Sequence, residues 1–414
     1  MQKLYQDSIA IVRRYAKPSL FITLTANPKW VEIERELLPH HTASDRPDLV
    51  AHVFNLKVQD LLDQIRHKEV FGSWLGWVWT IEYQKRGLPH LHLLVFLKTD
   101  QTFLTAANID RFISAEIPTG TDVMSQELRG IIQSTMVHTH CVGGNGKALC
   151  MEGLHPLTTK TCHEGFPRQF QPENIITEDD YPLYRRKNMG QCFSIPVRAT
   201  EGNVMAVIDN QRVVHYSPYF SLRYKAHVNV EVCGSVKAVK YIHNYIYMGG
   251  DRATAIMISD HDEINRHLNG RYIGSTEAVW RLFEFSTDQE LPSVTTLALH
   301  LPDDQAVYFS DCEAPDDLRE RLDWSMTTLT SWFVYNSERA DATGHLYHEF
   351  PEQYVYVRKV GWKPMKQRFS IGRMWSASPF MGERYYLRLL LTIVRGARSF
   401  KDLRTVDGIQ HESF

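Results

Sequence analysis

The sequence is poor in cysteine and has no long apolar segment. Its 6 cysteines among 414 residues are unevenly spaced, which does not suit a disulfide framework and favours a reducing compartment. No run of 18 or more apolar residues occurs, so no membrane-spanning helix is expected. The first residues lack a signal-peptide pattern, and the chain has neither an internal repeat nor a low-complexity tract. These absences argue against membrane proteins, disulfide-rich secreted domains and repeat arrays.

A nucleotide-binding phosphate loop is also missing. The pattern Gly-x4-Gly-Lys-Ser/Thr does not occur in the chain. The segment GGNGKA at 143–148 does not fit it, because Ala148 stands where a metal-binding hydroxyl is required. ATP hydrolysis is therefore not expected from this chain.

The composition is that of a folded protein with more than one domain. Hydrophobic residues make up 43% and charged residues 23% of the chain, and two or three domains are expected for 414 residues. A formal net charge of −2 by itself argues against a nucleic-acid binder. Residues 351–414 nevertheless hold 12 Lys and Arg against 5 Asp and Glu. That excess is either a local footprint for phosphates or a solvated surface that balances an acidic middle.

Residue patterns predict where strands and helices lie along the chain. Alternating or β-branched segments bounded by turn residues predict strands, and segments with helical spacing predict helices. The expected strands are 19–28, 74–84, 90–98 and 227–232. The expected helices are 49–67, 126–135 and 235–248, with an irregular, Gly-rich loop at 141–167. An acidic, linker-like stretch near 311–320 follows a domain boundary expected between 260 and 300.

Two histidines stand at alternate positions in the hairpin IEYQKRGLPHLHLLVF. His90 and His92 therefore share one face of their strand. Matching the apolar faces places Glu82 and Gln84 on that same side, which requires a loop of three or five residues around Gly87. Two imidazoles with a carboxylate or amide suit a divalent metal with open positions. The alternative is a polar strand face turned to solvent.

Two tyrosines lie four residues apart in the segment SVKAVKYIHNYIYMGG. Tyr241 and Tyr245 are neighbours on the expected helix, roughly opposite its apolar stripe. Such a pair is either ordinary surface aromatics or a pair of nucleophiles. A phenolate can attack a phosphodiester that a metal polarises.

Together these motifs carry a resemblance to a known family. The segments SLFITLTANPKWVEI, EYQKRGLPHLHLLVF and AVKYIHNYIYMGGDRAT resemble the three motifs of the Rep endonuclease of Helitron rolling-circle transposases, within the HUH superfamily. YSPYFSLRYKAHVNVEVC, RYIGSTEAVWRLFEF, IGRMWSASPFMGERYYLRLLL and SFKDLRTVDG also look like that family's pattern. The resemblance therefore covers nearly the whole chain, in order.

The resemblance implies a fold and a set of roles. The fold would be α+β, with an antiparallel HUH palm in 1–264 and a mixed α/β accessory domain in 265–414, which in Helitrons leads into a helicase. His90 and His92, with Glu82 or Gln84, would hold Mg²⁺ or Mn²⁺. Tyr241 and Tyr245 would attack single-stranded DNA and leave a 5′-phosphotyrosine and a free 3′-OH. A nuclear location would follow. The alternatives are a plasmid or virus replication initiator and a non-catalytic, zinc-stapled DNA-binding module.

A further group of metal-ligand residues lies in the Gly-rich loop. The pattern H-x2-C-x8-C-x11-C consists of His138, Cys141, Cys150 and Cys162. The resembling family has a similar Cys-rich segment that ends in a Phe-Pro pair, as here at 166–167. Three thiolates and an imidazole suit a closed, structural zinc site. His140 and His163 are rival ligands, and reduced cysteines without metal are the alternative.

Contacts with DNA are expected at basic residues near aromatic ones, since single strands bind through phosphate contacts and base stacking. The candidates are Lys85, Arg86, Arg185, Arg186 and Lys187. They could equally be solvated loop residues. The face with His227, Asn229 and Glu231 either lines the site or is the wet side of a strand.

Overall fold

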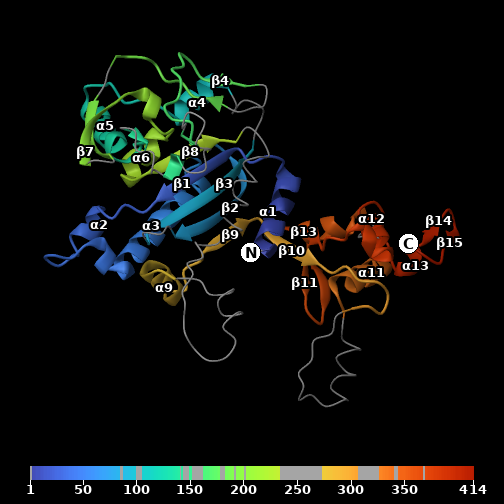
Figure 1. The fold of residues 1–414 in the computed structure, drawn as a ribbon. Coiled ribbons are helices and arrows are strands. Elements are labelled where there is room, and N and C mark those ends of the chain that lie inside the picture. The colour runs from blue at the N-terminus through green and yellow to red at the C-terminus, as the bar shows by residue number, and fades with distance from the viewer. Residues whose placement is uncertain are drawn as a thin grey trace. The chain divides into compact units, whose positions relative to one another are not determined.

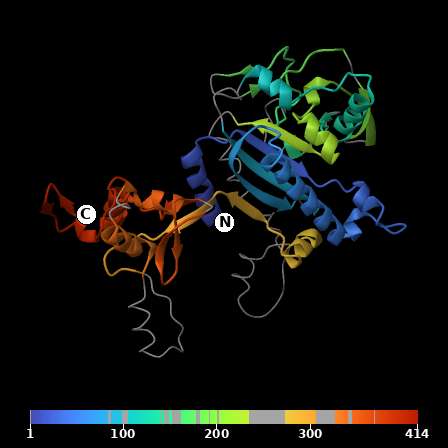
Figure 2. The same cartoon turned by 180° about the vertical axis from the view of Figure 1, so that it is seen from behind.

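The structure is a computed structural model of the 414-residue chain. It describes residues 2–83, 87–98, 105–139, 141–142, 149–151, 162–177, 182–190, 193–199, 202–233, 273–305, 326–339, 344–366 and 369–414. Figures 1 and 2 show its ribbon from opposite sides. The predicted helix at 235–248 and the acidic stretch at 311–320 lie outside the described residues.

The chain divides into two compact units. Unit 1 comprises Met1–Tyr5 and Lys17–Gln289, and unit 2 comprises Gln6–Ala16 and Glu290–Phe414. Most of helix α1 (Gln2–Tyr15) thus belongs with the carboxy-terminal part of the chain. The predicted domain ranges, 1–264 and 265–414, stay a prediction.

Unit 1 is built on a five-stranded sheet whose order is β8-β1-β3-β2-β9. The strands are β1 (Leu20–Thr25), β2 (Trp74–Tyr83), β3 (Pro89–Leu97), β8 (Val228–Val232) and β9 (Asp288–Leu291). The pairs β1·β3, β1·β8 and β2·β3 are antiparallel. Four of these strands lie where β-branched and aromatic residues predicted them, because such side chains pack well on a pleated surface.

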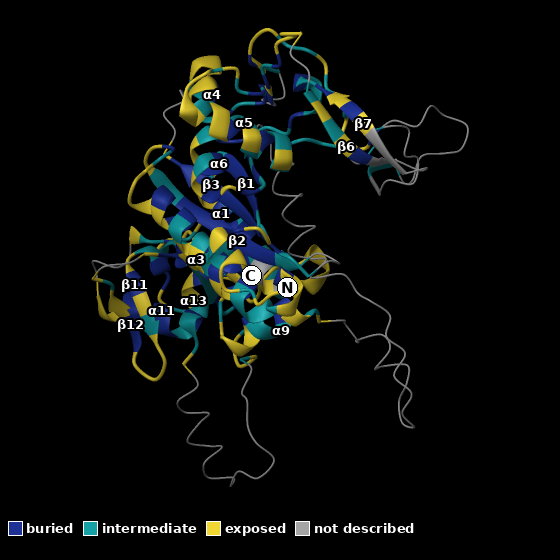
Figure 3. Cartoon of the chain, turned by 90° about the vertical axis from the view of Figure 1, so that its left-hand side faces the viewer, coloured by how far each residue is buried: buried dark blue, intermediate teal, exposed yellow. Residues whose placement is uncertain are grey.

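The hairpin of β2 and β3 has the register that the apolar alternation predicted. Tyr83 pairs with Pro89, so the connection has five residues. Glu82 lies opposite His90, and its side chain consequently points to the same face. The nine residues of β3 are all buried, and Figure 3 shows β1, β2 and β3 largely in the dark blue of buried residues.

Helix α3 (Pro47–Arg66) covers an apolar face in unit 1. Pro47 takes the first helical position, where its missing N–H costs no hydrogen bond. Its buried stripe includes Phe54, which contacts Trp30 and Trp280 of helix α9 (Ser275–Leu282). Aromatic contacts of this kind join α3 to α9 beside the sheet. In both views α9 lies below the sheet and the cyan-to-green segment lies above it.

That segment holds three helices and a long hairpin. The helices are α4 (Ala106–Phe112), α5 (Val123–Thr135) and α6 (Pro218–Tyr224). The hairpin strands are β6 (Phe193–Ala199) and β7 (Gly202–Ile208), with the short pair β4 (Ile175–Ile176) and β5 (Pro182–Leu183) nearby in sequence. Ile132 and Met136 pack on Val213 and Tyr216, which gives the segment its own apolar core.

Unit 2 mixes short sheets with helices. Strand β10 (Ser293–Leu297) pairs in parallel with β13 (Ser370–Met374), and β11 (Tyr354–Val357) pairs antiparallel with β12 (Gly361–Pro364). The other α-helices and strands of unit 2 are α11 (Thr328–Glu338), α12 (Glu383–Leu390), α13 (Phe400–Leu403), β14 (Thr405–Val406) and β15 (Ile409–Gln410). Unit 1 also contains the short helix α2 (Val31–Glu34). Trp332, Tyr347 and Phe350 form the centre of the core of unit 2.

The α+β class is confirmed. Helices and antiparallel sheets occur in unit 1, and unit 2 adds a parallel pair. Within the described ranges, every helix is too short or too polar to span a bilayer.

A buried ion pair ties α1 to the strands of unit 2, and its loss should be costly. Arg373 Nε donates to Asp7 Oδ1 at 2.6 Å, and the Asp7 residue is 2% exposed. Asp7→Ala leaves the guanidinium buried without its counter-charge, so we expect the free energy of unfolding to fall by about 3 kcal/mol or more. Urea unfolding followed by tryptophan fluorescence measures it.

The matched control is the ion pair between Arg14 and Glu352, which is much more exposed. Glu352→Ala should cost less than about 1 kcal/mol, because solvent screens such pairs. Equal losses in the two variants would contradict this interpretation.

Candidate functional site

One face of the sheet in unit 1 is polar yet buried. His90 is 8% and His92 is 5% exposed. The neighbouring strand β1 places Thr25 opposite His90 and Thr23 opposite His92. The alternative of a solvent-exposed polar face therefore does not describe these histidines. A buried polar group needs a partner, so the contacts of each ring nitrogen are informative.

The two imidazoles are held at Nδ1 and differ at Nε2. Thr23 Oγ1 lies 3.2 Å from His92 Nδ1, and Thr25 Oγ1 lies 3.1 Å from His90 Nδ1. His92 Nε2 lies 2.8 Å from Glu82 Oε2. His90 Nε2 is buried and has no hydrogen-bond partner. Both Nε2 atoms are thus the ones left for Glu82 or a further ligand.

Burial keeps His90 and His227 uncharged near neutral pH. It lowers the pKa of His90 to about 3, with smaller contributions from the charges of His92 and His227. Burial, followed by the charge of His215, lowers the pKa of His227 to about 4. A neutral imidazole is the form that binds a metal ion. The orphaned His90 Nε2, with the adjacent Glu82 carboxylate and His92, therefore fits a divalent cation.

Strand β8 extends the same polar face on the other side of β1. Asn229 pairs with Thr23, and His227 Nδ1 lies 3.4 Å from Thr25 Oγ1. His215 Nε2 lies 3.7 Å from Glu231 Oε2. The face with His227, Asn229 and Glu231 is thus a half-buried continuation of the histidine face.

Three residues of this face were not singled out from the sequence. Thr23 and Thr25 look like ordinary β-branched strand residues, although their alternation places both on one face. His215 reaches the face because Tyr216 forms an isolated bridge with Asn229. No local pattern marks His215, because this pairing joins distant parts of the chain.

Several predicted site residues lie outside the described part of the chain. Both tyrosines, Tyr241 and Tyr245, are among them. So are Gln84, the alternative third ligand, and Lys85 and Arg86 in the hairpin loop. Their roles stay predictions.

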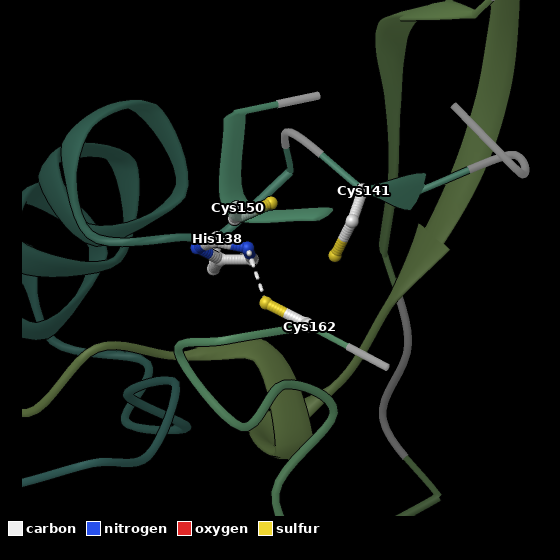
Figure 4. A group of neighbouring side chains, drawn as sticks. All are labelled: His138, Cys141, Cys150 and Cys162. Atoms are coloured by element: carbon white, nitrogen blue, oxygen red, sulfur yellow. Dashed lines mark hydrogen bonds between the residues drawn. The ribbon is translucent and has the colours of Figure 1, made fainter. Parts of the chain in front are cut away.

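The second candidate centre brings four distant residues together. The ligand atoms of His138, Cys141, Cys150 and Cys162 all lie within 4.8 Å of one another. Figure 4 shows their side chains converging, with His138 Nε2 at 3.4 Å from Cys162 Sγ. This group could hold a metal ion such as zinc, since three thiolates and one imidazole make a closed tetrahedral set.

The surroundings of this group orient its members. The His138 ring stacks on Phe166 with centroids 4.5 Å apart, and Arg212 Nη1 donates to Cys141 Sγ at 3.8 Å. Burial and the neighbouring thiols, Cys162 first, raise the pKa of Cys150 to about 12. Without a cation the Cys150 thiol thus holds its proton, and metal binding would release it. Of the rival ligands, His140 is not described, and His163 donates its backbone N–H to the Cys150 carbonyl.

Two of the three basic side chains predicted at 185–187 form hydrogen bonds or ion pairs with other residues of the protein. Arg186 is 4% exposed, and its Nη1 donates to the carbonyl oxygens of Asn210 and Val213 at 2.7 and 2.5 Å. Arg185 forms ion pairs with Asp110 and Glu116. The Arg186 guanidinium is thus engaged by carbonyl acceptors inside the protein, and the DNA contacts predicted for Arg185 and Arg186 stay predictions.

The third residue of the run and the flanking aromatic differ in exposure. Lys187 is exposed and keeps its predicted role as a proposal. Tyr184 is buried and stacks on His215 at 4.6 Å between ring centroids. Burial and the contact with His215 therefore leave the Tyr184 ring unavailable for stacking on a base.

Residues 1–95 match the family model described as the Helitron helicase-like domain at the N-terminus. That segment is Helitron-related. The match includes Thr23, Thr25, Glu82 and both histidines of β3, which carry the polar face. It ends before the Cys/His group and both tyrosines, so the Helitron relationship of those parts is carried by the sequence resemblance alone. No curated protein matches the chain significantly.

Zinc binding by the Cys/His group can be tested by metal content. The purified chain should contain about one zinc per molecule, and Cys162→Ser should lose it because a four-ligand site then lacks one thiolate. A chelator that strips the metal should also lower the melting temperature, since metal binding is coupled to folding.

Cys233→Ser is the matched control, because Cys233 is also buried but lies outside the group. It should retain the zinc. Equal zinc content in the Cys162 and Cys233 variants would rule this site out.

Proposed function

We propose that the chain is a metal-dependent single-stranded DNA endonuclease and strand transferase of a rolling-circle, Helitron-type transposon. The observation that carries the proposal is the buried polar face of the sheet. There the orphaned His90 Nε2 lies on the same face as His92 and Glu82, which contact each other at 2.8 Å. The family match over 1–95 covers the part of this face on β1, β2 and β3.

The catalytic cation would be held by His90 and His92 through their Nε2 atoms, with Glu82 or Gln84 as third ligand. When bound there, Mg²⁺ or Mn²⁺ would supply Lewis-acid stabilisation of the charge on the scissile phosphate. Glu82 Oε2 already lies 2.8 Å from His92 Nε2, which supports it as a ligand beside the two imidazoles. Burial keeps the His90 imidazole uncharged, so His90 requires no deprotonation before it binds the cation.

Cleavage is assigned to Tyr241 and Tyr245. A phenolate oxygen attacks phosphorus, a P–O bond to tyrosine forms, and the bond to the 3′ oxygen of the upstream strand breaks. The departing 3′ oxygen takes up a proton, and the downstream strand keeps a 5′-phosphotyrosine. One phosphodiester replaces another, so joining needs no ATP. Two tyrosines allow one to hold a cleaved end while the other cuts again.

The other parts of the chain receive supporting roles in this proposal. Lys85 and Arg86 in the hairpin loop, together with Lys187, contact the backbone of single-stranded DNA. Residues 1–264 form the nuclease domain, and 265–414 form an accessory domain that leads toward a helicase partner. The protein acts in the nucleus on transposon ends.

A covalent-adduct assay tests this function. The chain is incubated with 5′- and 3′-labelled single-stranded oligonucleotides and Mn²⁺, with and without EDTA. We expect a protein adduct on the 5′ end of the downstream product, lost with EDTA and in the Tyr241→Phe, Tyr245→Phe double variant. His90→Ala should also abolish it, because the metal loses a ligand.

Tyr386→Phe is the control, since Tyr386 is an exposed tyrosine of α12 in unit 2. It should form the adduct as well as the unmodified chain. Intact DNA binding without any adduct would contradict the catalytic proposal. It would favour a non-catalytic DNA-binding module that a zinc ion in the Cys/His group stabilises. Cleavage confined to plasmid or viral origins would favour a replication initiator.

A further inference from the structure

We infer that Thr23 and Thr25 are positioning residues that hold the two metal-binding imidazoles by Nδ1, so that each Nε2 faces the cation. This inference rests on the proposed function, because it assumes a divalent cation at His90 and His92. It assigns a role to residues of β1 that do not themselves touch the metal.

The strand register provides the geometry. Antiparallel pairing of β1 with β3 places Thr23 opposite His92 and Thr25 opposite His90, with all four side chains on one face. Each threonine Oγ1 approaches the Nδ1 of the histidine opposite it, at 3.2 and 3.1 Å. The same contact thus occurs twice, two residues apart, as the period of a strand requires.

The hydroxyl can accept the proton of Nδ1. When a neutral imidazole donates Nδ1–H to a threonine oxygen, its Nε2 keeps the lone pair that a metal needs. The free Nε2 of His90 agrees with this tautomer. His92 Nε2 instead donates to the Glu82 carboxylate, which only accepts, so a cation that binds there would take the place of this proton and leave Nδ1–H to donate to Thr23. Metal-bound histidines commonly donate their second N–H in this way, and that bond fixes both ring orientation and tautomer.

Thr25 also reaches a third histidine. Its Oγ1 lies 3.4 Å from His227 Nδ1 as well as 3.1 Å from His90 Nδ1. A hydroxyl that accepts from His90 still has its own proton to donate to His227. The chain of contacts from β3 through β1 to β8 therefore sets both tautomers together.

A threonine could occupy such a strand merely because β-branched residues pack well there. Thr80 provides the comparison within the same sheet. It lies opposite His92 from the other side, on β2, and is 9% exposed like Thr23. Among the described residues Thr80 makes no hydrogen bond to either imidazole. Packing alone would make the three threonines equivalent, whereas positioning singles out Thr23 and Thr25.

Binding of Mn²⁺ to the full-length chain, measured by electron paramagnetic resonance, separates these possibilities. The Cys/His group is first saturated with zinc. Valine matches threonine in shape but lacks the hydroxyl, so Thr23→Val and Thr25→Val should each weaken Mn²⁺ binding by about 10- to 100-fold. Thr25→Ser restores the hydroxyl and should restore affinity. Thr80→Val should bind as the unmodified chain does.

The outcomes distinguish this inference from the proposed function. Unchanged affinity in both Thr23→Val and Thr25→Val, with binding abolished in His90→Ala, overturns the inference and leaves the metal site standing. No binding by the unmodified chain, or equal binding by His90→Ala, overturns both. If Thr25→Val does not unfold cooperatively and is therefore misfolded, the Mn²⁺ affinities of Thr23→Val and Thr25→Ser decide whether the inference holds.

Discussion

The pairing of β3 with β1 on one side and β2 on the other is the constraint on which the candidate site depends. It brings Glu82, from one neighbouring strand, and Thr25, from the other, to the same face as the histidines of β3. A shift of one residue would turn every side chain of β3 over. Leu91 and Leu93 would then face the polar side, and both imidazoles would enter the apolar layer beneath. Burial of the apolar side chains of β3 therefore fixes the strand register, and that register determines which side chains lie on the polar face.

Burial gives that face its chemistry. An imidazole in water near neutral pH exchanges protons freely, whereas one beneath the surface stays neutral, because desolvation penalises the charged form. The cost is that every buried polar atom needs a partner. Threonine hydroxyls meet that need at Nδ1 of His90 and His92. One ring nitrogen, His90 Nε2, is left over. Buried groups without partners are unusual in folded proteins and often mark a function.

The sequence predicted what depends on neighbours along the chain. The period-two alternation determined the hairpin, its five-residue loop and the shared face of Glu82 and His90. Local pattern could not predict partners that lie far away. Arg186 reads as part of an exposed basic run, but carbonyl oxygens 24 and 27 residues downstream take up its guanidinium. Arg373 likewise binds Asp7 across 366 residues, which assigns helix α1 to the carboxy-terminal unit.

Two candidate metal sites in one chain raise a question of selectivity. Affinity for a given ligand set rises from Mn²⁺ to Zn²⁺, so zinc would outcompete manganese at two imidazoles and a carboxylate if affinity alone decided. The closed set of His138 and three cysteines suits zinc by both softness and geometry. The polar face of the sheet offers fewer and harder ligands, and in the proposed function a cation there would have positions left for phosphate oxygens. Because Mg²⁺ and Mn²⁺ accept oxygen ligands readily, bound DNA would complete their coordination and shift the preference toward them.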